Sequence, residues 1–299
     1  MQGLCKRLLW ATLTLSLAGA AHAELRVFAC EPEWAALTRE LAGDNAEVFA
    51  ATHAGQDPHH VQARPSLIAK LRSADLAVCT GAELETGWLP MLQRRARNPK
   101  VLTGRPGYFE ATQQVELLDK PDKLDRAEGD VHGEGNPHIQ LDPRRISNVA
   151  KALSARFQLI DSANQADYQR RLQQFTERWR AATAQWQSQA ALLQGKRVIV
   201  HHREWIYLLD WLGMTRVGSL EPKPGIPPTL AHLAELKQQK ADLILISPLN
   251  YDKPSAWLHE QTGTPVVILP QTMGAVPNSD DLFEFFDEIV RRLTAKGQM

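Results

Sequence analysis

Three short segments of this 299-residue chain carry histidines whose setting suits metal binding. "GQDPHHVQARPS" holds His59 and His60, "NPHIQLDP" holds His138, and "VIVHHREW" holds His201 and His202. Neutral imidazole nitrogens are preferred ligands of Zn²⁺, which often takes three protein ligands and leaves a fourth position for water or a carboxylate. We therefore expect a zinc site built from distant parts of the chain.

The elements around these segments predict where the histidines meet. Apolar runs such as "LRVFAC" and "ADLAVC" in the first half, and "KRVIVHH" and "ADLILISP" in the second, alternate with helical segments. This pattern predicts two parallel-sheet α/β lobes. Ligands bind beyond the carboxyl ends of such strands, where His59 and His202 fall. His138 lies in a turn constrained by Pro137, so three imidazoles can share one cleft.

The adjacent histidines are expected to have lesser roles. Neighbouring side chains on a strand point to opposite faces, so we expect His201 and His202 not to face the same ion. His60 and His201 are then predicted to lie at the rim of the site or behind the ligands.

The longest periodic segment predicts a connection between the lobes. Apolar residues from Tyr168 to Leu193 recur in steps of three and four, which indicates one amphipathic helix of about 30 residues ending at Gly195. We predict an N-terminal lobe at 24–160, a long linking helix at 161–194 and a C-terminal lobe at 195–299. The aromatic stripe of this helix is expected to pack in the core rather than to bind a ligand.

The N-terminus has the three-part pattern of a secretory signal peptide. Lys6 and Arg7 precede an apolar run, and "AHA" ends at Ala23. The run is shorter than the roughly 20 residues that a spanning helix needs. Cys5 precedes the run instead of following it, so we expect a periplasmic protein cleaved after Ala23 and free of a lipid anchor.

Composition and cysteines narrow the class further. Lys plus Arg and Asp plus Glu each number 34, so no basic excess indicates a nucleic-acid partner. We also expect the protein to be a monomer. Cys30 and Cys79 each end an apolar run. They predict either a disulfide between neighbouring strands of an exported protein or two buried thiols.

A polar segment, "LDKPDKLDRAEGDVHGEGNPH", predicts a surface loop over about 120–135. Its one internal histidine, His132, and its carboxylates leave two interpretations, a solvated loop or a metal-collecting loop beside the site. Metal-collecting loops are usually rich in histidine, which favours the solvated loop.

The histidine segments together resemble one known family, the periplasmic substrate-binding proteins of zinc and manganese ABC importers. "DPHHVQARPS" resembles the family's DPHxxxxxPS, "NPHIQLDP" its DPHxWLDP, and "HREWIYLLDWLGM" its HxxxxYxxxxxG. "EPKPGIPPTLAHL" resembles the loop and helix that follow. The resemblance covers nearly all of the chain after the signal segment.

This resemblance implies a function and a ligand set. The family's metal ligands correspond to His59, His138 and His202, and histidine at the third position favours zinc over manganese. The implied fold has two lobes joined by one rigid helix, with the ion between them. The implied role is to bind Zn²⁺ as cargo and deliver it to the membrane permease of an ABC importer, without enzymatic activity.

The chain departs from the family at the fourth ligand. Many members have an acidic residue after the last strand, where this chain reads "LPQTMG". The fourth position is left open between water, Glu204, His60, Asp280 and Asp281, although helix capping is the favoured role of the last two. Two other functions also stay open: a manganese binder or adhesin of the same fold, and a zinc hydrolase with Glu204 as general base.

Overall fold

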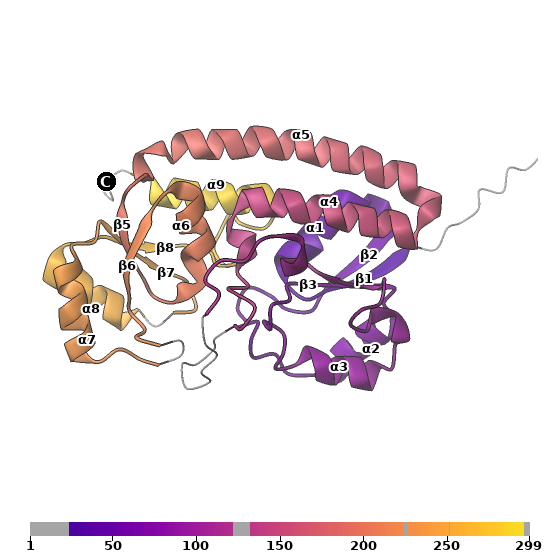
Figure 1. Ribbon diagram of the computed structural model, residues 1–299, viewed down its shortest axis with the longest axis horizontal. Coiled ribbons are helices and arrows are strands. Elements are labelled where there is room, and N and C mark those ends of the chain that lie inside the picture. Colours follow the sequence, from indigo (N-terminus) through magenta and orange to yellow (C-terminus); the bar gives the residue numbers. More distant parts are fainter. Residues whose placement is uncertain (1–23, 122–131, 224–225, 251, 296–299) are drawn as a thin grey trace, which may run out of the picture.

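Residues 24–121, 132–223, 226–250 and 252–295 are described by a computed structural model, in which two α/β lobes lie side by side beneath one long helix (Figure 1). The predicted fold class is confirmed. The signal segment 1–23 and residues 122–131 of the acidic loop lie outside the described residues.

The N-terminal lobe is built on a four-stranded parallel sheet of order β2-β1-β3-β4. Its strands are β1 (Leu25–Ala29), β2 (Ala46–Ala50), β3 (Leu76–Cys79) and β4 (Tyr108–Glu110), and its helices are α1 (Pro32–Ala42), α2 (Pro65–Ser73) and α3 (Leu89–Ala96). The apolar run of β3 is buried on both faces, as expected for a strand inside a parallel sheet.

The C-terminal lobe repeats this arrangement with the order β6-β5-β7-β8. Its strands are β5 (Arg197–Val200), β6 (Thr215–Ser219), β7 (Leu243–Ile246) and β8 (Val266–Ile268), and its helices are α6 (Ile206–Leu212), α7 (Leu230–Leu236), α8 (Lys253–Thr262) and α9 (Leu282–Leu293). The carboxyl ends of both sheets face the region between the lobes (Figure 1).

Two helices tie the lobes together. Helix α4 (Pro143–Ile160) begins with Asp142 as its N-cap, and α5 (Gln165–Gln189) runs along the top of the molecule over both lobes (Figure 1). Helix α5 is shorter than predicted, because the chain tightens into a 3₁₀ turn at Ala191–Leu193. The hydrophobic period continues through that turn, so periodicity alone did not show the end of the helix.

The aromatic stripe of α5 is core, as predicted. Trp179 stacks on Phe175 and donates to the Pro143 carbonyl at 2.8 Å, which fixes α5 to α4. Trp186 stacks on Phe286 and donates to Asp287 Oδ1 at 2.6 Å, which fixes the other end of α5 to α9. One stiff helix therefore contacts elements of both halves of the molecule.

Direct hydrogen bonds between the lobes add to this connection. The Thr272 hydroxyl donates to Glu33 Oε2 at 2.6 Å, and Gln140 Nε2 donates to the Gln271 carbonyl at 3.1 Å. Asn136 Nδ2 donates to the Arg203 carbonyl at 3.0 Å.

The two cysteines form a disulfide, with their Cα atoms 4.8 Å apart. Residues 29 and 78 pair across β1 and β3, so Cys30 and Cys79 follow the register at the carboxyl end of the sheet. Both are fully buried. Of the two interpretations of these residues, the disulfide is confirmed.

Within the described part of the chain, no helix has the length and hydropathy that a membrane crossing requires.

Candidate metal-binding site

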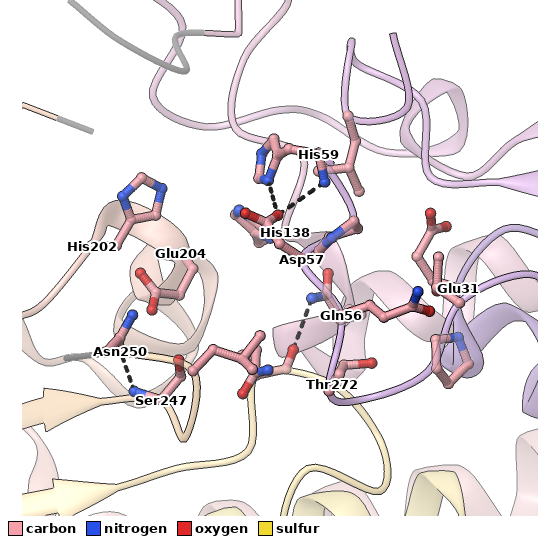
Figure 2. Close-up of a pocket in the computed structure, with 18 of the residues that line it drawn as sticks. Glu31, Gln56, Asp57, His59, His138, His202, Glu204, Ser247, Asn250 and Thr272 are labelled. Carbon is pink, nitrogen blue, oxygen red and sulfur yellow. Dashed lines mark hydrogen bonds and ion pairs between the residues drawn. The ribbon is translucent and has the colours of Figure 1, made fainter. Parts of the chain in front are cut away.

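A cavity of about 530 Å³ lies between the carboxyl ends of the two sheets, and residues of both lobes line it (Figure 2). All three predicted ligands, His59, His138 and His202, belong to its lining. Five carboxylic acids also line the cavity, whereas the described lining residues include no lysine or arginine: Glu31, Glu33, Asp57, Glu204 and Glu221. Such a lining favours a cation over an anion.

His59 is held by the residue two positions before it. Asp57 Oδ1 accepts from the His59 backbone N–H at 2.9 Å and lies 2.8 Å from His59 Nδ1. Burial alone would raise the pKa of Asp57, but the hydrogen bonds from His59 outweigh it and lower that pKa to about 2. An ionised Asp57 places the proton of His59 on Nδ1, so Nε2 keeps its lone pair for an ion.

His138 is the most buried of the three histidines. It is 9% exposed and lies at the start of a 3₁₀ turn, Ile139–Leu141, which leads into α4. Its backbone N–H donates to Asn136 Oδ1 at 3.0 Å. Burial holds the pKa of His138 well below its usual value, and the neighbouring His59, His202 and His132 lower it further. His138 therefore stays neutral, the state that a metal ligand requires.

His202 is held from the C-terminal lobe. Its Nδ1 lies 2.9 Å from Glu221 Oε2, an arrangement equivalent to that of His59 and Asp57. His201 Nε2 lies 3.6 Å from the other oxygen of Glu221. Strand β5 ends at Val200, so the alternation of side chains along a strand does not extend to His201 and His202. Both line the cavity.

The three imidazoles form a row across the cavity. The ring centroids of His59 and His138 are 5.9 Å apart, and those of His138 and His202 are 6.4 Å apart. Rings that share one tetrahedral zinc at about 2.05 Å per Zn–N bond lie about 5 Å apart. Each of these two separations is therefore about 1 Å longer than in a set of rings bound to one zinc ion.

One other group of potential ligands is more compact. Cys30, Cys79 and Glu85 are the only three such residues in the described ranges whose ligand atoms all lie within 4.8 Å of one another. The two sulfurs are bonded to each other, so they offer no thiolates, and this group is a disulfide packed against a buried carboxyl.

The candidates for the fourth ligand differ in whether they line the cavity. Glu204 is 5% exposed, lines the cavity and has an oxygen with no hydrogen-bond partner, and Figure 2 shows it beside His202. Burial raises the pKa of Glu204. Asp281 instead caps α9 by accepting from two backbone N–H groups. Asp280 and the exposed His60 do not line the cavity.

Sequence reasoning missed the carboxylates that orient the histidines. Asp57 carries a local signal, since it stands two residues before His59 in the same turn. Glu221 is 19 residues from His202 and reaches it because β5 and β6 pair in parallel, with the Glu221 N–H donating to the His201 carbonyl at 3.1 Å. No local sequence pattern predicts the contact between Glu221 and His202.

The sequence analysis also did not identify the buried acids of the N-terminal lobe. Glu31 and Glu85 both accept hydrogen bonds from Thr80. Burial raises the pKa of Glu33 and of Glu85 to about 7 each, and it raises the pKa of Glu31 well above its usual value.

Comparison with known proteins identifies relatives along almost the whole chain. Residues 27–296 match the sequence model of a family described as "Zinc-uptake complex component A periplasmic". A manganese ABC transporter substrate-binding lipoprotein, PsaA of Streptococcus mitis, is 24% identical over 257 residues, which cover 83% of this chain and 80% of PsaA. The zinc-binding lipoprotein AdcA of Streptococcus pneumoniae is 29% identical over 212 residues, 67% of this chain but only 40% of AdcA.

Solved structures agree on the fold. A zinc-bound deletion mutant of ZnuA superposes with a TM-score of 0.74 at 19% identity, covering 91% of this chain and 97% of that one. The identity is low, so this similarity supports the fold alone.

Proposed function

We propose that this chain, which belongs to the zinc-uptake complex component A family, carries Zn²⁺ held by His59, His138 and His202. Members of the family are metal-binding substrate-binding proteins of ABC importers and not enzymes. Among its relatives are proteins named for manganese and proteins named for zinc. The choice between these metals therefore depends on the residues of the cavity.

The observation that carries the zinc proposal is the orientation of two of the imidazoles. Asp57 and Glu221 each occupy the Nδ1 side of a histidine, which leaves Nε2 as the donor atom in both. Neutral imidazole suits Zn²⁺, whereas Mn²⁺ prefers carboxylate, carbonyl and water oxygens. The buried, neutral His138 lies between them and completes a set of three nitrogen donors.

The two carboxylates also balance charge. A divalent cation taken into a partly buried cavity needs nearby negative charge, and the side chains of Asp57 and Glu221 are placed to provide it through the histidines. Burial raises the pKa of Glu204, as it does those of Glu31 and Glu33, so these acids of the lining can release a proton when a cation arrives.

A competition experiment tests the choice of metal. Purified apo-protein would be dialysed against equal concentrations of Zn²⁺ and Mn²⁺ near pH 7, and the bound metals would be counted by elemental analysis. The proposal predicts one zinc per chain with almost no manganese. Predominant manganese would instead support the manganese-binding alternative.

We further propose that the chain acts in the periplasm as a free monomer, cleaved after Ala23, which delivers zinc to an ABC permease. The relatives PsaA and AdcA are named lipoproteins, whereas the cysteine of this chain's N-terminal segment, Cys5, precedes the apolar run. Mass spectrometry of the mature chain tests this point. An N-terminus at Glu24 supports release, and a lipid-modified cysteine would contradict it.

A further inference from the structure

His132 contacts His59 at a distance that two ligands of one ion would have. The Nε2 atoms of these residues are 3.2 Å apart, and their ring centroids are 5.3 Å apart. Two nitrogens bound to the same tetrahedral zinc at about 2.05 Å lie about 3.3 Å apart. Of the histidine pairs that include His59, the pair with His132 thus has the spacing of two ligands of one ion.

The direction of His59 supports the same conclusion. Asp57 occupies the Nδ1 side of His59, so the nitrogen that approaches His132 is the one expected to bind the ion. His132 also lies close enough to His138 to lower its pKa. His132 therefore borders two of the three proposed ligands.

Backbone contacts place His132 there. The Gly133 N–H donates to Glu83 Oε2 at 2.6 Å, and the Gly135 N–H donates to the His132 carbonyl at 3.2 Å. Gly135 has a φ of +126°, and a Cβ at this residue would lie 2.7 Å from Leu117 Cβ. The turn thus depends on glycine, and it returns His132 to the N-terminal lobe.

The three proposed ligands leave the fourth coordination position of a tetrahedral zinc ion without an assigned residue. Asp281 caps α9, "LPQTMG" offers no acid after β8, and Glu204, which lines the cavity beside His202, is the competing candidate. We propose that His132 is the fourth metal ligand, giving a site of four imidazoles. This inference rests on the proposed zinc function and deepens it, because four nitrogen donors in a tetrahedron select Zn²⁺ against the oxygen-preferring Mn²⁺.

X-ray absorption spectroscopy of the zinc-loaded, full-length mature protein tests this directly, because scattering from imidazole rings counts the histidines on the metal. We expect four imidazoles in the wild type and three in His132→Ala. His60→Ala is the matched control, since His60 also neighbours His59 but is exposed, with its ring centroid 6.2 Å from that of His59. It should keep four.

Affinity provides the second readout. His132→Ala should weaken zinc binding by about 10- to 100-fold, because water can fill the vacated position, and should leave manganese binding nearly unchanged. Three imidazoles in the wild type, or equal zinc affinity of wild type and His132→Ala, would overturn the inference. A loss in Glu204→Gln without a loss in His132→Ala would assign the fourth position to Glu204 instead.

The two proposals fail in different ways. If His132 is not a ligand, His138→Ala still abolishes tight zinc binding. If the zinc function itself is wrong, His138→Ala and His132→Ala both bind zinc as the wild type does.

Discussion

His202 Nδ1 lies 2.9 Å from Glu221 Oε2, and on the other side of the cavity His59 Nδ1 lies 2.8 Å from Asp57 Oδ1. Each lobe thus contributes one imidazole that is oriented by its own carboxylate. Such carboxylate–histidine pairs fix the tautomer and raise the basicity of the nitrogen that binds metal.

Neutralising one of these carboxylates should weaken metal binding without removing a ligand. We expect Glu221→Gln to lower zinc affinity by about 10- to 100-fold, because the amide neither balances the charge of the cation nor fixes the proton on Nδ1. Titration calorimetry measures this. Glu260→Gln, on the exposed face of α8, is the control. Equal affinities of Glu221→Gln and wild type would show that Glu221 does not support the site.

The buried acids predict how stability depends on pH. The folded-state pKa of Glu33 is about 7, against 4.5 for the exposed group. Between these values the folded protein binds more protons than the unfolded chain, so stability falls as pH rises from about 4.5 to 7 and stays low above that. The shift corresponds to about 3 kcal/mol.

Glu33→Gln should therefore stabilise the metal-free protein at pH 8 by about 1–3 kcal/mol, with little effect at pH 4.5. The amide oxygen can still accept the bond from Thr272 that links the lobes. Urea unfolding at both pH values measures the difference, with the exposed Glu177→Gln as control. A gain of equal size at both pH values would rule out titration of Glu33 as its cause.

The disulfide should contribute to stability rather than to metal binding. Cys30 and Cys79 are 49 residues apart and fully buried, and closing a loop of that length stabilises a protein by about 2–4 kcal/mol. The double variant Cys30→Ala/Cys79→Ala should lose that amount in chemical unfolding and keep its zinc affinity. If zinc binding fell with stability intact, the sulfurs would have to act at the metal site.

The central strands of each sheet were predictable from sequence, but one edge strand of each sheet was not. The runs at β1, β3, β5 and β7 are continuous and apolar because both faces of these strands are buried. The edge strands β4 and β6 were missed. The β6 sequence, "TRVGS", has no apolar run, since its first residues are exposed and Gly218 lies against Leu236.

In the candidate site, too, some residues were predictable from sequence and some contacts were not. Constrained turns at Pro58 and Pro137 drew attention to His59 and His138, and the end of β5 to His202. The contacts of His202 with Glu221 and of His59 with His132 span 19 and 73 residues. They arise from strand pairing and from the return of the loop at Gly135, which only the folded chain reveals.

The most direct test of the account is a calorimetric titration of Zn²⁺ into the metal-free wild type and into His138→Ala. His138 is the buried neutral nitrogen between the two lobes, so its loss should weaken zinc binding by about 100-fold or more, while circular dichroism shows an intact fold. Wild-type zinc affinity in a folded His138→Ala would contradict the central claim that this row of histidines holds the cargo.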